Sequence, residues 1–207
     1  MLRVGLTGSI AVGKSFVLGV LRELGARTID ADAIAREVVQ PQTAGLKAVV
    51  EEFGPEILRP DRSLDRAKLG SIVFADESKR HKLNSLLHPF IIARQDEIMH
   101  RWATEAPDAI AIVDAALMIE SGGYQRFDKL IVVHCRPEIQ LERLIKRDGI
   151  SRAEAERRIN AQMPQAEKKK HADYLVDTSE GFESAREQTS IVWQQLRTIQ
   201  SARDAHL

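Results

Sequence analysis

The sequence predicts an α/β protein whose core is a doubly wound parallel sheet of five strands. Five short apolar runs lie along the chain, at residues 2–6, 27–29, 109–113, 130–133 and 174–176. The runs are continuous rather than alternating, which is typical of strands buried on both faces of a parallel sheet. Helix-like segments separate them, and right-handed crossovers between successive strands then wind the helices onto both faces.

The composition is compatible with one globular unit that carries smaller insertions. The chain has 207 residues, with 30 acidic and 30 basic side chains, so no overall field favours nucleic acid or an anionic membrane. The single cysteine, Cys135, excludes a disulfide within the chain and a cysteine zinc site, and we expect it to be buried. We find no signal-type segment and no apolar stretch long enough to cross a bilayer, and therefore expect a soluble cytoplasmic protein.

The first strand leads into a complete phosphate-binding motif, G-x-x-x-x-G-K-S. Its residues are Gly8-Ser9-Ile10-Ala11-Val12-Gly13-Lys14-Ser15, and a helix-like segment follows at 17–24. The order strand, loop, helix is what this motif requires, whereas the alternative is an ordinary glycine-containing turn. Backbone N–H groups and the helix dipole would hold a polyphosphate, Lys14 would reach its terminal phosphates, and Ser15 would ligate Mg²⁺. The sequence therefore predicts a P-loop NTPase core that binds a nucleoside triphosphate.

Two intervals interrupt the alternation of strands and helices. Residues 32–107 contain helix-like sequence without a strand, and we expect a helical insertion at the carboxyl edge of the sheet, where ligands bind in such folds. Within it, Asp65 and Asp76 are expected helix caps, and Pro89 is expected to begin the helix toward His100. Gly25 is placed to end the first helix in a left-handed conformation.

The second interval, residues 148–172, is short, helical and strongly charged. A capping box from Ser151 to Glu154 opens a helix that carries Arg152, Arg157 and Arg158. Its position before the last strand predicts a mobile lid, whereas its charge alone is also compatible with a solvated polar helix. The predicted core then comprises residues 1–31, 108–147 and 173–207, with a final helix over about 181–202.

Carboxylates end two of the predicted strands and are candidates for the chemistry. Asp30 and Asp32 follow the second strand and would point the same way if the chain stayed extended. Asp32 is placed to accept or orient the proton of an attacking hydroxyl, with Asp30 in a supporting role. The alternative is that Asp32 only caps the next helix. Asp114 ends the third strand, where an aspartate commonly holds the water shell of the metal, although a simple turn residue is also compatible.

Basic side chains supply the remaining candidates. Arg143 and Arg147 are four residues apart on one helix face, so both could contact the transferring phosphoryl group or the adenine. Local pairing with Glu142 and Lys146 is the competing interpretation. His88 lacks metal-ligand spacing and is expected to be structural or to contact a substrate.

These residues resemble the family of dephospho-coenzyme A kinases. The matching segments are Thr7-Gly8 with the loop, Ile29 to Arg36, Phe53-Gly54, Leu64-Asp65-Arg66, Val73-Phe74, Leu83-Asn84, Leu87-His88-Pro89, Leu117 to Glu120, Gln140 to Asp148, Arg158-Ile159, Ala161-Gln162 and Ala172 to Asp177. They follow in order over nearly the whole chain. The loop alone is unspecific, but the Asp-Ala-Asp, Leu-His-Pro and Arg-Asp segments together are specific.

The resemblance implies a kinase with a core, a helical acceptor domain and a lid, which moves the γ-phosphoryl of ATP to the ribose 3′-hydroxyl of dephospho-CoA. It implies that the loop through Phe16 binds ATP and that Ser15 and Asp114 hold Mg²⁺. Asp32, Lys14, Arg143 and Arg147 would be catalytic, and the acceptor would contact Thr7, Asp32, Arg36 and His88. The expected partners are these two small molecules, without nucleic acid or membrane, in a monomer or weak homo-oligomer.

The chain departs from the family pattern at several positions. The family loop is usually richer in glycine, whereas this loop has Ser9, Ala11, Val12 and Phe16. If position 11 needs a positive φ, an alanine there costs on the order of 1 kcal/mol. Beyond the loop, Ala116, Ile119 and Thr178 stand where proline, phenylalanine and asparagine are usual.

Two other functions remain open from the sequence. One is a P-loop kinase that acts on another nucleoside or nucleotide. The other is a nucleotide-binding module without catalysis, which the altered loop would suit. A GTPase switch is disfavoured, because no Asn-Lys-x-Asp segment occurs in the chain.

Overall fold

A computed structural model describes residues 1–204 of the chain, which fold as two compact units. The first comprises Met1–Ile29 together with the chain from Trp102 onward, and the second comprises Asp30–Arg101. The first unit carries the sheet and the second is helical.

The sheet of the first unit has five strands, in the order β2-β3-β1-β4-β5. They are β1 (Leu2–Gly8), β2 (Arg27–Asp30), β3 (Ile110–Asp114), β4 (Lys129–His134) and β5 (Tyr174–Asp177). The pairings β1–β3, β1–β4 and β4–β5 are parallel. The predicted doubly wound sheet is confirmed, and its central strand β1 leads into the phosphate-binding motif.

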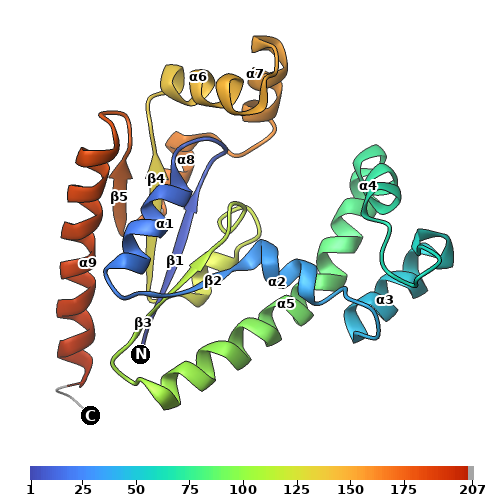
Figure 1. Cartoon of the computed structure of the whole chain (residues 1–207), viewed down its shortest axis with the longest axis horizontal. Coiled ribbons are helices and arrows are strands. Elements are labelled where there is room, and N and C mark those ends of the chain that lie inside the picture. Colours follow the sequence, from blue (N-terminus) through green and yellow to red (C-terminus); the bar gives the residue numbers. More distant parts are fainter. Residues whose placement is uncertain (205–207) are drawn as a thin grey trace. The chain divides into compact units, whose positions relative to one another are not determined.

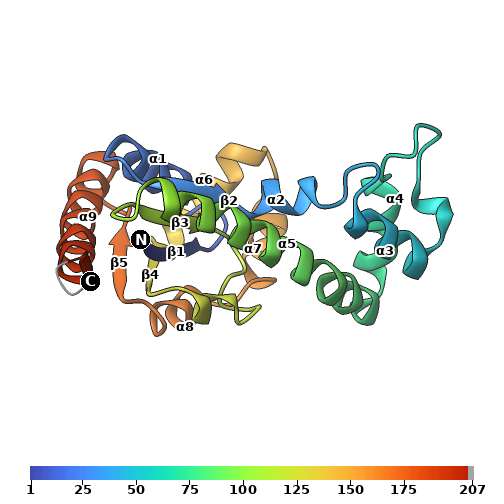
Figure 2. The ribbon, with the colours of Figure 1, turned by 90° about the horizontal axis from the view of Figure 1, so that it is seen from below.

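Helices cover both faces of this sheet. On one face lie α1 (Lys14–Glu23) and α9 (Phe182–Asp204), side by side, and on the other lies α8 (Gln165–Lys169) (Figures 1 and 2). Between the sheet and α1 and α9 is the main apolar core, built from residues such as Leu6, Ile112 and Leu196. Burial of this surface, at about 25 cal/mol per Å² of apolar area, stabilises the scaffold that holds the loop edge.

Beyond the carboxyl end of β4 lie α6 (Pro137–Asp148) and α7 (Arg152–Asn160) (Figure 1). Gly149 ends α6 in a left-handed conformation, with φ 64°. The hydroxyl of Ser151 accepts the Glu154 N–H and so caps α7, which confirms the predicted start of this helix. A one-turn helix, η2 (Gly123–Arg126), precedes β4.

The second unit consists of α2 (Ala31–Glu37), α3 (Ala44–Phe53), η1 (Pro55–Ile57), α4 (Arg66–Ala75) and most of α5 (Glu77–Glu105). The predicted caps are confirmed, since Asp65 accepts the Lys68 N–H and Asp76 accepts the Lys79 N–H. The predicted helix start at Pro89 is wrong, because Pro89 lies inside α5. The helix begins after the Asp76 cap, at Glu77, twelve residues before Pro89. Its 29 residues stay helical although Pro89 removes one backbone hydrogen bond.

Candidate active site

The phosphate-binding motif forms a tight turn between β1 and the N-terminus of α1. Ala11 and Gly13 both adopt left-handed backbone conformations, with φ 60° and 87°. A Cβ on Gly8 would lie 2.7 Å from the Val133 carbonyl oxygen, so the close approach of β4 requires glycine there. The turn directs backbone N–H groups and the positive end of the α1 dipole to one place, which is the geometry of an anion site.

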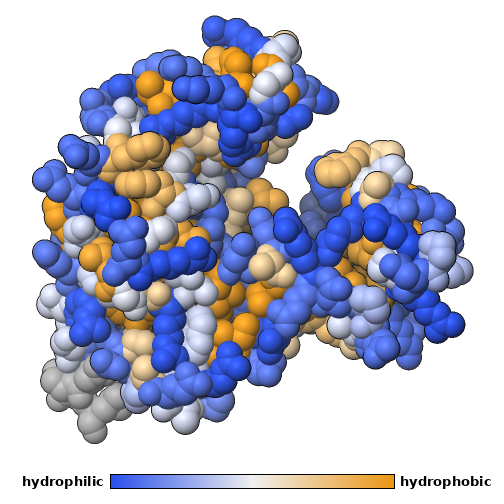
Figure 3. All heavy atoms as spheres, in the orientation of Figure 1, coloured by the Kyte–Doolittle hydropathy of each residue, from blue (hydrophilic) through white to orange (hydrophobic). Residues whose placement is uncertain are grey.

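A cavity of about 630 Å³ opens on this turn. It is lined by Gly8 to Ser15, by Ala116 and Phe182, by Arg143, Lys146 and Arg147 of α6, and by Gln162. A larger cavity, about 770 Å³, lies between α6 and α7 and contains no residue of the motif. Figure 3 shows hydrophobic atoms among hydrophilic ones over these two helices. We assign the active site to the smaller cavity, because only it combines backbone donors with several cations.

The floor of the site holds an ion pair between Lys14 and Asp114. The register of β1 with β3 places Asp114 opposite Leu6, two residues before the motif. The side chains are 18% and 11% exposed. An ammonium and a carboxylate therefore meet where the terminal phosphates of a nucleotide would lie.

Oxygen groups beside this pair fit a hard cation. The Ser15 hydroxyl is exposed in the first turn of α1, and the Asp114 carboxylate lies at the floor. Within residues 1–204 no cluster of three or more histidine, cysteine or acidic side chains could hold a metal alone. One hydroxyl, of Ser15, and one carboxylate, of Asp114, suit Mg²⁺, because this ion keeps several waters and binds through one or two carboxylates plus substrate phosphates.

Arg143 contacts the motif through Thr178. Its guanidinium donates to the Thr178 hydroxyl (2.8 Å) and to the Thr178 carbonyl (2.7 Å). The Thr178 hydroxyl in turn donates to the carbonyl of Val12 at 2.7 Å. Thr178 also lies under Gly13, where a Cβ would be 3.2 Å from its oxygen. The threonine at this position of the chain thus connects α6 with the phosphate-binding turn.

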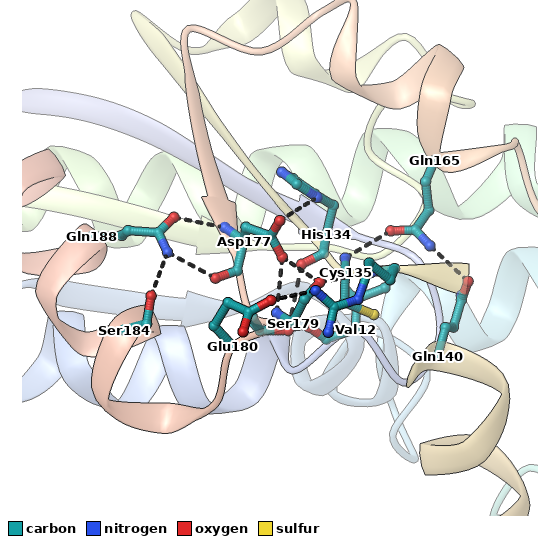
Figure 4. A network of polar contacts seen from close by, with 12 residues as sticks. Val12, His134, Cys135, Gln140, Gln165, Asp177, Ser179, Glu180, Ser184 and Gln188 are labelled. Atoms are coloured by element: carbon teal, nitrogen blue, oxygen red, sulfur yellow. Dashed lines mark hydrogen bonds and ion pairs between the residues drawn. The ribbon is translucent and has the colours of Figure 1, made fainter. Parts of the chain in front are cut away.

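Three glutamines tie the turn to α6 and to the segment before β5. The Ile10 N–H donates to Gln162 Oε1, and Gln140 Nε2 donates to the Ile10 carbonyl, both at 2.8 Å. Gln165 Nε2 donates to Gln140 Oε1, and the Cys135 N–H donates to Gln165 Oε1 (Figure 4). Both the backbone N–H and the backbone carbonyl of Ile10 are therefore hydrogen-bonded to glutamine side chains.

The ends of β4 and β5 carry a second polar network beside the site (Figure 4). Burial lowers the pKa of His134, which Asp177 opposes from 3.9 Å. For Asp177 itself, burial raises the pKa, but hydrogen bonds from the Ser179 hydroxyl and N–H outweigh it, so the pKa is lowered. Burial raises the pKa of the Cys135 thiol, which is buried as predicted. These shifts favour the neutral forms of His134 and Cys135 and the ionised form of Asp177.

The charged segment 148–172, for which the sequence predicts a lid, is held mainly by local pairs. Arg157 and Arg158 both bond Glu154, and Arg152 bonds Glu156. Lys168 differs, because its side chain is 1% exposed and its Nζ lies 2.8 Å from Glu120 Oε1 and from the Ala116 carbonyl. Lys168 lies in a charge-rich stretch of sequence, where a lysine is normally exposed to solvent. In the fold its side chain is buried and fixes α8 to Glu120 and to the Ala116 carbonyl.

The structure places the predicted site residues in two groups. Lys14, Arg143 and Arg147 line one cavity with the motif, and Asp114 bonds Lys14 there. Thr7 is fully buried, and its hydroxyl donates to the Ala116 carbonyl. Phe16 lies against Phe182, with ring centroids 4.6 Å apart.

The acceptor-side candidates Asp32, Arg36 and His88 belong to the second unit, where all three are exposed. The chain does not stay extended after β2, because α2 begins at Ala31. Asp30, rather than Asp32, caps this helix by accepting the N–H groups of Asp32 and Ala33. The interpretation of Asp32 as a mere cap is therefore wrong, and its side chain projects from the first turn of α2.

The sequence pattern predicts no binding or catalytic role for several residues that contact the site, namely Gln140, Gln162, Gln165, Lys168 and Thr178. Two of the glutamines lie in segments that carry the family resemblance, which is the only signal that could have marked them. A neutral amide has no characteristic spacing, so its partner becomes visible only in the folded chain.

Comparisons with known proteins point to one family. A family model described as dephospho-CoA kinase matches residues 2–184. A dephospho-CoA kinase of Streptomyces avermitilis is 45% identical over 196 residues, covering 95% of this chain and 94% of its own length. One from Geobacter metallireducens is 44% identical, covering 94% and 96%. The solved structure of a dephospho-CoA kinase from Campylobacter jejuni superposes with a TM-score of 0.72 at 29% identity, covering 95% and 97%. In the described chain, no helix combines the length and apolarity that a membrane span needs.

Proposed function

The chain belongs to the dephospho-CoA kinase family, and from this we propose that it transfers the γ-phosphoryl of ATP to the ribose 3′-hydroxyl of dephospho-CoA, giving CoA and ADP. This is the last step of coenzyme A biosynthesis. The observation that carries the proposal is the phosphate-binding turn with Lys14, Asp114 and Arg143 on one cavity, in a chain that matches the family over most of its length.

ATP would bind with its phosphates in the turn that ends at Ser15. The N–H groups of the turn and the α1 dipole hold the phosphate oxygens, and Lys14 exchanges its contact with Asp114 for the terminal phosphates. Ser15 and Asp114 would hold Mg²⁺, which supplies charge neutralisation between the β- and γ-phosphates. The Ser9 hydroxyl is buried and has no hydrogen-bond partner within residues 1–204, which leaves it available to a bound anion.

Arg143 and Arg147 would stabilise charge on the transferring phosphoryl group. Both line the cavity from α6, one turn apart. The two bonds to Thr178 fix the Arg143 guanidinium before the reaction, so little reorganisation is needed in the transition state. Arg147 is more exposed and bonds the adjacent Asp148.

The acceptor would bind through the helical unit. Asp32 would take or orient the proton of the 3′-hydroxyl, while Arg36, four residues later on α2, would contact acceptor phosphates. His88 would contact the acceptor from α5, and Thr7 would act from inside the core by holding Ala116. Residues 32–107 would form the acceptor domain and residues 148–172 the lid. The cytoplasmic location and the monomer or weak homo-oligomer stay predictions.

The test is a coupled assay of ADP release with and without dephospho-CoA. We expect release to require dephospho-CoA and to fall about 10²- to 10⁴-fold in Asp32→Asn, because the variant keeps the shape but loses the base. ATP binding by Asp32→Asn should stay within twofold of the parent chain. Asp61→Asn, an exposed aspartate of the same unit, serves as the matched control.

Three results would contradict the proposal in different ways. Turnover with another nucleoside or nucleotide, and none with dephospho-CoA, would show that the proposed acceptor is wrong. ATP binding without transfer to any acceptor would favour a non-catalytic module. Normal turnover by Asp32→Asn would remove Asp32 from its role.

A further inference from the structure

We propose that Gln162 and Gln140 are positioning residues that hold the backbone N–H and the backbone carbonyl of Ile10, in two successive peptide groups, and thereby keep the phosphate-binding turn in its nucleotide-binding form. We call these two side chains and Gln165 the glutamine clamp. The inference rests on the proposed function only in taking ATP as the nucleotide.

The turn needs such support because a non-glycine residue, Ala11, directly follows Ile10. Ala11 has φ 60°, a conformation in which its Cβ crowds the backbone and which glycine adopts without strain. A free loop with alanine there would spend part of its time in other conformations, and ATP would bind only the fraction with the correct one. Gln140 fixes the carbonyl of the peptide that joins Ile10 to Ala11, and Gln162 fixes the N–H of the peptide before it. Together they restrict the backbone rotation that would relieve the strain at Ala11.

The clamp is directional, so its amide groups have one consistent orientation. The Cys135 N–H is a backbone donor and must face Gln165 Oε1 (3.0 Å). Gln165 Nε2 then faces Gln140 Oε1 (2.7 Å), which leaves Gln140 Nε2 to donate to the Ile10 carbonyl. Gln140 is 2% exposed, so water competes little for these bonds. The fixed end of β4 thus orients the amide that holds the turn.

The neutral charge of the clamp suits its place beside the phosphates. Gln162 lines the cavity and bonds the Ile10 N–H at 2.8 Å. A carboxylate at this position would accept the same bond but would repel a bound triphosphate. An amide supplies the acceptor oxygen without a negative charge.

The test measures ATP affinity in Gln162→Met, which keeps the length of the side chain and removes the acceptor. Loss of one positioned hydrogen bond should raise the ATP dissociation constant about tenfold. The kcat at saturating ATP should stay within about twofold, because bound ATP itself holds the turn. Gln195→Met, an exposed glutamine on α9, is the matched control and should change neither quantity.

A second substitution separates positioning from general stabilisation. In Gln162→Met, adding Ala11→Gly removes the strain and should restore the dissociation constant to within about threefold of the parent value. In the parent chain, where the clamp already holds the turn, Ala11→Gly should lower the dissociation constant by a smaller factor than it does in Gln162→Met. A role in general stability would give no such rescue.

Direct observation of the Ile10 amide completes the test. Its hydrogen should exchange with solvent faster in Gln162→Met than in the parent chain or in Gln195→Met. If Gln162→Met does not fold, Gln140→Met replaces it, because that variant removes the donor to the Ile10 carbonyl without adding a charge.

The proposal is overturned if a folded clamp variant binds ATP within twofold of the parent chain, or if Ala11→Gly has the same effect with and without Gln162. Binding is measured without an acceptor. Failure of the chain to phosphorylate dephospho-CoA would therefore refute the proposed function. The ATP dissociation constants of the clamp variants would still test the role of the clamp.

Discussion

Two neighbouring helices, α6 and α7, carry arginines at helical spacing but use them differently. On α6, Arg143 makes two hydrogen bonds to Thr178, 35 residues along the chain. On α7, Arg157 bonds Glu154, three residues away and in the same helix. Arginines at equal spacing in the sequence therefore make different contacts, because each contact depends on the partner that the fold places beside the guanidinium.

The two helices meet at one shared carboxylate. Asp148, at the end of α6, bonds Arg147 of its own helix and Arg158 of α7. The hydrogen bond from Arg147 lowers the pKa of Asp148, so this link persists through the neutral range. Pairs of this exposed kind contribute little to stability, whereas a guanidinium fixed by two bonds beside the reaction centre can contribute much to the rate.

The largest effect should come from Arg143→Lys. Lysine keeps the positive charge but cannot make the two fixed bonds to Thr178, so the cation would no longer be held at the phosphate-binding turn. We expect kcat/KM for ATP to fall about 10²-fold in the ADP-release assay. The same substitution on α7, Arg152→Lys, should change it less than about threefold. Equal losses in the two variants would remove the difference between the helices.

A smaller effect should follow from Lys168→Met, measured as the free energy of unfolding in urea. The variant leaves the Ala116 carbonyl and Glu120 without the ammonium that bonds both, so stability should fall by about 2 kcal/mol. Lys170→Met, which loses only an exposed pair with Glu167, should change stability by less than about 0.5 kcal/mol. Similar values for the two lysines would show that burial of Lys168 is unimportant.

The smallest effect should come from Arg157→Ala on α7. Its side chain is 77% exposed, and its bonds to Glu154 are replaced by water and by Arg158. We expect a change in the free energy of unfolding below about 0.5 kcal/mol. A decrease of more than about 1 kcal/mol in the free energy of unfolding would mean that the local ion pairs stabilise α7. The arginines of α6 and α7 would then differ less in importance than we expect.

The sequence predicted the fold well where the pattern is local or repeats along the chain. Five apolar runs gave the five strands, and the cap residues Asp65 and Ser151 gave helix starts, because side chain and backbone there interact within a few residues. At Pro89 the same local reasoning was wrong, since the cap at Asp76 and the length of α5 outweighed one lost hydrogen bond. At Asp32 the alternative of a helix cap is wrong, because the Asp30 side chain accepts the N–H groups of Asp32 and Ala33 instead.

The sequence by itself determined the phosphate-binding turn, its strand and helix, and the cations that could serve it, because a motif of eight consecutive residues carries its own geometry. Only the tertiary structure decided which distant groups hold that turn: Thr178 under Gly13, the glutamines on Ile10, and Lys168 in the interior. Their hydrogen bonds join residues far apart along the chain. Such contacts leave no periodicity in the sequence, since their geometry exists only after the sheet has assembled.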